Sequence, residues 1–306
     1  EADNMAIRGA VRDAGIKHII TSKMEHSAVL NTITHLLRKK KVTVSYVETN
    51  QNGEINFNHL KILLSKNKNV LVSLMHGNNE IGNLLNLRKV SELCKEYNAL
   101  FHSDTVQTIG HYNFNLQKLK IDFLACSAHK FHGPKGIGFL YINKNINITP
   151  LIHGGTQERN MRGGTECVYG IAGLSKAMEV AYRDLSIHRK HIESLKKHMI
   201  HQIQKKLPFM SFNGKCSDFK KSLYTILSLS LPKPKDKYGE LLLFNLDLLG
   251  VACSGGSACS SGNISQSHVI KQIKTQNGPI IRFSFSKFNT FQDVGITVDK
   301  LMSLYN

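Results

Sequence analysis

Residues 121–142 read IDFLACSAHKFHGPKGIGFLYI and join an apolar run to a glycine-rich loop. The run IDFLAC (121–126) is typical of a strand that is buried on both faces of a sheet. Lys130 follows this strand closely, where the loop begins. A lysine in this place is either a solvated surface charge or a nucleophile held over a ligand. In a chain with 40 lysines and arginines the first interpretation is the usual one for a lone lysine, so the rest of the sequence must decide.

Apolar runs alternate with helical patterns along the N-terminal half of the chain. After residue 86, Leu87, Val90, Cys94 and Tyr97 recur with the spacing of one helix face. Short apolar runs, typical of strands, occupy residues 18–22, 42–49, 69–75, 99–104 and 121–126, with a helical pattern over 28–40. This alternation predicts an α/β domain with a largely parallel sheet.

A long helical pattern from Gly170 to about Leu207 separates two regions. It is long for one globular helix, so we expect a bend or break near Leu185 that leads into a second domain. We therefore predict a large domain over 1–185 and a smaller C-terminal α+β domain over 186–306. The second region shows strand-like runs at 222–231 and 279–288 and a last helix from about Thr290, where Thr290 and Asp293 have capping-box spacing.

The composition is that of a globular protein with a strong basic excess. The chain has 306 residues, 41% of them hydrophobic, and a net charge of +18. No apolar run approaches the roughly 20 residues that span a bilayer, so no membrane contact is expected. The charge reflects either a general drift toward lysine or attraction to an acidic partner or RNA. Because no basic motif interleaved with aromatic residues is present, direct nucleic-acid binding is not expected.

Six cysteines occur, none of them in a C-x-x-C pair or with the spacing of zinc ligands. This usage predicts free thiols in a reducing compartment, the cytoplasm, and no metal site. The sequence starts without Met on EADNMAIRG, which is typical of the first turns of a helix. We therefore expect an N-terminal portion of the fold to be missing.

Polar residues follow three successive predicted strands. Asn79, Asp104 and Lys130 are each one strand–helix unit apart. In open parallel sheets, ligands bind outside the carboxyl ends of the strands, so this fold class would gather an amide, a carboxylate and a lysine on one edge. Each residue alone is weak evidence, because an aspartate after a strand is more often a helix cap or a turn residue.

Six motifs, in order and spacing, carry a resemblance to a known family. They are TSKMEH, HGNNEIG, SDTVQTIG, SAHKFHGPKGIG, HGGTQERNMRGGTE and CSGGSACSSG. Together they closely resemble the cysteine desulfurases of the NifS/IscS type, which depend on pyridoxal 5'-phosphate and belong to the aminotransferase class V group. The resemblance extends from Glu1 to the C-terminal helix. It implies fold type I, a mostly parallel sheet flanked by helices with a smaller C-terminal α+β domain.

The resemblance also implies which residues hold the cofactor. Lys130 would form the Schiff base, and Asp104 would pair with the pyridine nitrogen and keep it protonated. Gln107 would contact the phenolic oxygen, and Asn79 would lie near the same edge. His26 would stack on the ring and assist proton transfers, where its plainer interpretation is a surface histidine. A lysine must lose its proton to attack a carbonyl, and partial burial favours the neutral amine.

For the phosphate, the resemblance implies Ser127 and His129, which flank the lysine. Thr165 would reach the phosphate of a neighbouring subunit, so the active unit would be a homodimer. The sequence departs from the family pattern in two places, and the first, the main one, removes part of this cradle. The small residue and the threonine that precede the position of Glu1 in relatives are absent, and Gly164 stands where many relatives have serine.

Cys259 lies in GGSACSSG, a segment with little helix or strand propensity that predicts a mobile loop. A thiol on a mobile loop is accessible, which suits a nucleophile. By resemblance, Cys259 takes up the substrate sulfur. Cys253 matches no catalytic position of the family and is expected to be structural. Arg282 resembles the arginine that binds the substrate carboxylate, a group that arginine recognises in bidentate fashion. Without the resemblance, a surface charge at the edge of a strand would be an equally good interpretation of Arg282.

The implied reaction converts L-cysteine to L-alanine, with sulfur held on Cys259 as a persulfide. The sulfur would pass to an acceptor protein such as an iron–sulfur scaffold or a tRNA-thiolation enzyme. Two alternatives stay open. A selenocysteine lyase or another class V aminotransferase-like enzyme would keep Lys130 and Asp104, although the GGSACSSG segment favours the desulfurase with a long loop. The other alternative is a truncated, non-catalytic sulfur-delivery subunit.

Overall fold

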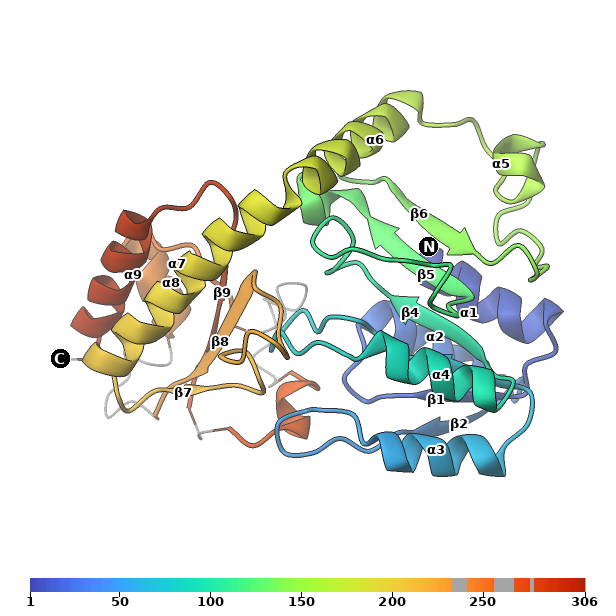
Figure 1. The fold of residues 1–306 in the computed structure, drawn as a ribbon, viewed down its shortest axis with the longest axis horizontal. Helices are drawn as coiled ribbons and strands as arrows, with labels where there is room; N and C mark the ends of the chain where they lie inside the picture. Colours follow the sequence, from blue (N-terminus) through green and yellow to red (C-terminus); the bar gives the residue numbers. More distant parts are fainter. Residues whose placement is uncertain (233–240, 256–266, 276–277, 306) are drawn as a thin grey trace. The chain divides into compact units, whose positions relative to one another are not determined.

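The computed structural model describes residues 1–232, 241–255, 267–275 and 278–305 (Figure 1). The chain forms two compact units. The first comprises Glu1–Thr49, Ile55–Gly77 and Leu85–Leu185, and the second comprises Asn50–Glu54, Asn78–Leu84 and Ser186–Asn306. Within the described ranges, no helix is both long and apolar enough to cross a membrane.

A six-stranded sheet organises the first unit, with strand order β2-β1-β3-β4-β5-β6. The first five strands run parallel, and β6 pairs antiparallel with β5 at the edge. The strands are β1 (His18–Thr21), β2 (Thr43–Tyr46), β3 (Val70–Ser73), β4 (Leu100–Asp104), β5 (Phe123–Ser127) and β6 (Gly138–Ile142). The predicted parallel sheet and its five strand positions are confirmed, each strand being shorter than its apolar run.

Helices cover both faces of this sheet (Figure 1). One face packs against α1 (Ala2–Asp13) and α2 (Ser27–Arg38), and the other against α3 (Phe57–Lys66), α4 (Leu87–Glu96) and α6 (Val168–Arg183). Successive strand residues alternate between the two cores: Leu71 belongs to the α1–α2 side, and Val70 and Val72 to the other. Burial on both faces explains why the interior strands, such as β3 and β5, are continuous apolar runs, whereas the edge strands β2 and β6 are more exposed. Two shorter helices, η1 (Ala128–Phe131) and α5 (Gln157–Asn160), complete the unit.

The expected break in the long helical pattern is confirmed at Asp184. Helix α6 ends at Arg183, and α7 (Leu185–Lys206) begins after it. The assignment of domains over 1–185 and 186–306 stays a prediction, since the second compact unit also takes in two short segments from the N-terminal half.

The second unit contains an antiparallel sheet of β7 (Ser211–Phe212), β8 (Ile226–Ser230) and β9 (Ile280–Ser284). Beside α7 it has α8 (Leu242–Leu248), η4 (Ile270–Gln272) and α9 (Phe291–Ser303). The predicted capping box is confirmed, because the Thr290 and Asp293 side chains each accept a bond from the other's backbone N–H.

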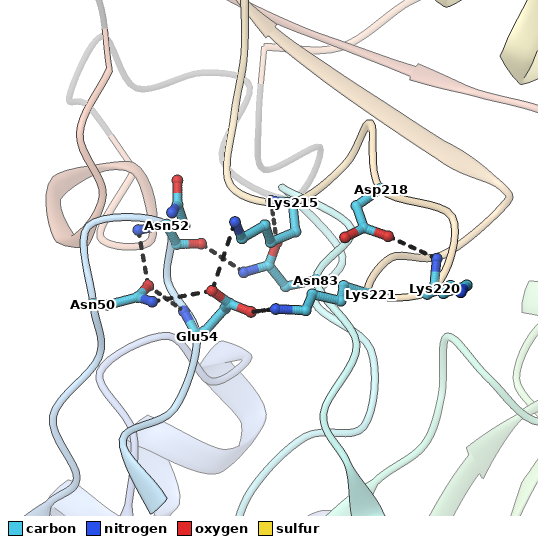
Figure 2. Close-up of polar contacts among 8 residues, drawn as sticks. All are labelled: Asn50, Asn52, Glu54, Asn83, Lys215, Asp218, Lys220 and Lys221. Atoms are coloured by element: carbon cyan, nitrogen blue, oxygen red, sulfur yellow. Dashed lines mark hydrogen bonds and ion pairs between the residues drawn. The ribbon is translucent and has the colours of Figure 1, made fainter.

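Polar contacts tie the two short N-terminal segments to this unit (Figure 2). Asn83 donates to the Asn52 carbonyl over 2.7 Å, and its own side-chain oxygen accepts from the Lys215 N–H over 2.8 Å. Glu54 pairs with the Lys221 ammonium at 2.8 Å. The segments are therefore held by side chains, as well as by chain connectivity.

Candidate active site

The carboxyl ends of neighbouring strands place several predicted site residues on one edge of the large sheet. Asp104 is the last residue of β4, opposite Ala125 of the adjacent β5. Lys130 lies in η1, three residues beyond the end of β5 at Ser127. His26 follows β1 and begins α2. Asp104 and Lys130 therefore come from adjacent strands, and the strand before His26 is separated from β4 only by β3.

Asp104 is buried, and its carboxyl oxygen accepts a hydrogen bond from the Val106 N–H over 3.0 Å. Burial raises the pKa of Asp104 to about 7, and the Asp3 carboxylate raises it further. The Val106 bond and the Lys130 ammonium act in the opposite direction. The positive charge of Lys130 therefore favours the ionised form of Asp104.

The backbone of Lys130 contacts neighbouring residues, while the residue as a whole is exposed. The His111 ring contacts the Lys130 carbonyl at 3.1 Å, and η1 ends at His132 in the left-handed region (φ 67°). Gly110, with φ 79°, packs against Phe131, the residue after Lys130. A Cβ at position 110 would lie 2.7 Å from the Phe131 side chain. The glycine of the SDTVQTIG motif therefore lets the lysine turn approach the loop after β4.

Ser127 and His129 are bonded to each other, with 2.9 Å between the hydroxyl oxygen and Nδ1. Partial burial lowers the pKa of His129, and the ammonium groups of Lys130 and Lys135 lower it further. A hydroxyl, an imidazole and two ammonium groups beside one another form a set of donors suited to an anionic group.

His26 is the N-cap residue of α2, and its Nδ1 accepts from the Ala28 N–H over 3.1 Å. This bond fixes the ring's orientation at the start of the helix. Gln107 is half-buried in the turn that follows Asp104, so it lies in the same loop as the carboxylate. Thr165 belongs to the same unit and is exposed, just before α6.

Three buried residues of this edge were missed from the sequence: Asp3, Glu25 and His102. Glu25 accepts hydrogen bonds from the Ser22 hydroxyl at 2.7 Å and from the Met75 N–H at 2.8 Å. Burial raises the pKa of Glu25 to about 8, with smaller contributions from the nearby carboxylates. Sequence signals could have found two of the three: Glu25 directly precedes His26 in TSKMEH, and His102 lies two residues before Asp104 on one strand face.

Asn79 and Arg282 lie in the second unit. The Arg282 guanidinium, on β9, donates to the Asn79 carbonyl over 2.7 Å. These two residues are therefore brought together with each other, and their meeting with Asp104 and Lys130 stays a prediction. Cys259 lies outside the described residues. Cys253 is half-buried, and burial raises the pKa of its thiol to about 11, which suits the structural role expected for it.

Comparisons with known proteins identify the family. Residues 1–296 match the aminotransferase class-V family. The cysteine desulfurase IscS of Dictyoglomus turgidum is 41% identical over 310 residues, which cover 98% of this chain and 76% of the relative.

Solved structures agree with this match. A structure described as a NifS-like protein superposes with a TM-score of 0.86 at 34% identity, over 99% of this chain and 79% of its own. A structure of SspA in complex with cysteine gives a TM-score of 0.76 at 26% identity, over 94% of this chain and 80% of its own. The chain therefore belongs to the aminotransferase class-V family and, within it, to the cysteine desulfurases of the IscS type.

Proposed function

We propose that this protein takes sulfur from L-cysteine and leaves L-alanine, with pyridoxal 5'-phosphate held between Lys130 and Asp104. The observation that carries the proposal is that the buried Asp104 ends β4 and Lys130 follows the adjacent strand β5, so both lie at the carboxyl edge of the sheet. Such an edge is where ligands of parallel sheets bind. Family membership supports the same reaction, since the matched relatives are named cysteine desulfurases.

The residues of this edge suit the cofactor's charges. Asp104 is a buried acid whose pKa of about 7 leaves it partly protonated at neutral pH, and a positive partner would favour its ionised form. Ser127 and His129 would hold the phosphate through their donors, and His26 would contact the ring. When bound, pyridoxal 5'-phosphate supplies an electron-withdrawing ring that stabilises negative charge on the substrate's α-carbon.

The chain's own residues would divide the remaining work. Arg282 would bind the substrate carboxylate, and Lys130 would move the proton of the α-carbon. The Cys259 thiolate would attack the substrate sulfur, the carbon–sulfur bond would break, and the β-carbon would take up a proton. One thiol and one cysteine thereby give one persulfide and one alanine, and no external oxidant is needed.

We also propose a homodimer and an acidic sulfur acceptor. Thr165 precedes an exposed apolar stretch in which Val168 is 71% and Tyr169 84% accessible. Exposed apolar patches of this kind mark interfaces. The net charge of +18 suits an acidic acceptor protein, with cytoplasmic thiols kept reduced. Light scattering of the wild type and of Tyr169→Glu tests the dimer, which the variant would weaken.

One experiment tests the reaction. The purified chain, loaded with pyridoxal 5'-phosphate, is expected to show a visible absorption band. With L-cysteine and a thiol reductant, it should release two products, alanine and sulfide. Lys130→Ala would lose the band and both products, whereas Cys259→Ser would keep the band and lose sulfide release. Sulfide release that survives Cys259→Ser would contradict the persulfide step, and a wild type without the band would contradict the cofactor assignment.

A further inference from the structure

A row of buried polar side chains crosses three strands of the large sheet, two residues before Asp104 on β4. Thr21, Ser73 and His102 are directly opposite one another on β1, β3 and β4. The Ser73 hydroxyl lies 2.8 Å from His102 Nδ1, and His102 Nε2 lies 3.3 Å from Asp3 Oδ1. Ser73 and His102 are fully buried, and Asp3 is 7% exposed. The row therefore ends on a carboxylate inside the protein.

The contact between His102 and Asp3 is unusually sparse for such a buried place. In the described part of the chain, neither Asp3 Oδ1 nor His102 Nε2 has a hydrogen-bond partner. A buried carboxylate and a buried imidazole that face each other without a hydrogen bond cost stability, so their presence calls for a functional explanation. Neither residue has a role in the reaction proposed above.

The fold brings this pair next to Asp104. His102 and Asp104 are two residues apart on β4, so both point to the face covered by α1 and α2. Asp3 lies in the first turn of α1, where it contacts His102, and its negative charge raises the pKa of Asp104. The other ionisable groups that act on Asp104, or are acted on by it, are Glu25 after β1, Lys130 in η1 and Cys126 on β5.

We propose that Asp3, oriented by His102 and Ser73, is a positioning residue that sets the ionisation of Asp104 and so its hold on the protonated ring nitrogen of the cofactor. This inference rests on the proposed function for its last step, while the effect of Asp3 on Asp104 concerns the chain alone. With Nδ1 accepting from the Ser73 hydroxyl, Nε2 would carry the ring's proton and point it toward Asp3 Oδ1.

The direction of the effect follows from the charges. A negative charge at Asp3 disfavours a second one at Asp104, and it favours a positive charge on a partner of Asp104. Removing the charge of Asp3 should therefore lower the pH at which Asp104 ionises. It should also lower the pH at which a bound ring nitrogen loses its proton.

The first test uses the chain without added cofactor. Carbon-13 NMR of aspartate carboxyl groups gives the ionisation midpoint of Asp104, whose signal is assigned by its loss in Asp104→Asn. We expect a midpoint near 7 in the wild type and a shift toward lower pH in Asp3→Asn. Asp13→Asn is the matched control: it removes a carboxylate from the end of the same helix, where Asp13 contacts Arg12 and Thr149. It should leave the midpoint in place.

Two His102 variants separate orientation from packing. His102→Gln keeps a donor and an acceptor in the ring's place, and His102→Leu keeps neither. If His102 orients a charged Asp3, His102→Gln should preserve the Asp104 midpoint and His102→Leu should lower it as Asp3→Asn does. If His102→Leu does not fold, the Asp3→Asn and His102→Gln pair still decides, because both are near-isosteric. An unchanged midpoint in Asp3→Asn overturns the proposal.

The second test uses the loaded protein and reads the pH dependence of the cofactor's absorption spectrum. We expect its transition to move to lower pH in Asp3→Asn and to stay in place in Asp13→Asn. If the wild type binds no cofactor, the proposed function fails and the NMR result still stands. If the cofactor binds and its spectrum titrates identically in both variants, the inference fails and the proposed function survives.

Discussion

Both units bury charged side chains, and they satisfy them in opposite ways. In the second unit, Lys196 is fully buried and donates to the Ser222 hydroxyl at 3.1 Å and to the Leu223 carbonyl at 2.7 Å. In the first unit, Asp3 and His102 face each other at 3.3 Å without an ordinary hydrogen bond. Lys196 therefore has hydrogen-bond acceptors in its own unit, whereas Asp3 lies among other acidic side chains.

This difference in hydrogen bonding suggests that Lys196 has a structural role and that the buried acids of the first unit have a functional one. Burial lowers the pKa of Lys196 to about 8, and its bonds tie α7 to the segment before β8. Among the acids of the first unit, by contrast, burial raises the pKa of Glu25 and of Asp104. The Asp3 carboxylate raises both pKa values further, and Asp104 also raises that of Glu25. Repulsion of this kind costs stability, so its presence at a ligand-binding edge argues for a chemical use.

The largest expected effect is on catalysis. Asp104→Asn keeps the acceptor for the Val106 N–H but removes the negative charge that a protonated ring nitrogen needs. We expect alanine formation from L-cysteine to fall by roughly 100- to 1000-fold, as when a preorganised electrostatic group is removed. Steady-state kinetics of the loaded enzyme measure this loss.

Asp218→Asn is the control for that variant, since Asp218 lies in the second unit and bonds to the Lys220 N–H (Figure 2). It should keep its activity. Asp104→Asn also removes a repelling acid from the cluster, so the protein should not unfold more easily above pH 7. Activity close to that of the wild type would refute the assigned role of Asp104.

The next effect is a pH dependence of stability at the acidic cluster. Glu25 has a folded pKa of about 8, against a usual value of 4.5. Its contribution to stability is therefore complete below pH 4.5 and is lost as pH rises toward 8, at up to about 1.4 kcal/mol per pH unit. Glu25→Gln should flatten the free energy of unfolding over this window. Urea denaturation at a series of pH values is the measurement, and an unchanged slope would mean that Glu25 is ionised in the folded protein.

Lys196 should show the opposite slope. Its folded pKa of about 8 lies below the usual 10.5, so stability should rise with pH between these values as the unfolded chain keeps the proton. Lys196→Met would remove that rise. It would also destabilise the protein near neutral pH by about 1–3 kcal/mol, because the Ser222 hydroxyl and the Leu223 carbonyl lose their donor. A Lys196→Met protein that is as stable as the wild type would erase the contrast between the units.

The smallest effect is expected at the exposed pair of the second unit. Glu54 binds Lys221 at 2.8 Å and Asn50 at 3.0 Å (Figure 2), and the Lys221 side chain is 53% exposed. Surface pairs contribute little, so Glu54→Gln should cost about 0.5 kcal/mol and less at high salt. A loss as large as that of Lys196→Met would show that the 50–54 segment is held more tightly than its exposure implies.

Several elements were predictable because they depend on local pattern. The parallel strands appear as apolar runs, and the capping box of α9 and the break at Asp184 were both visible in the sequence. Strand β6 and helix α3 were missed. The strand follows the glycine-rich loop within the opening motif, and it pairs antiparallel at the sheet edge. The helix is ten residues long and begins at an Asn56 cap, a signal that sequence reading could have used.

The sequence by itself determined the fold class, the family and the polar residues that follow each strand, because strand ends and motif spacing are local properties. The tertiary structure decided which acids share one interior. Asp3, Glu25 and Asp104 come from a helix, a loop and a strand. They act on one another because β2 lies at the sheet edge, which leaves β1 beside β3 and β4 next in the sheet. It also placed Asn79 with Arg282. Burial and charge repulsion arise from groups that are distant in sequence, so no pattern along the chain records them.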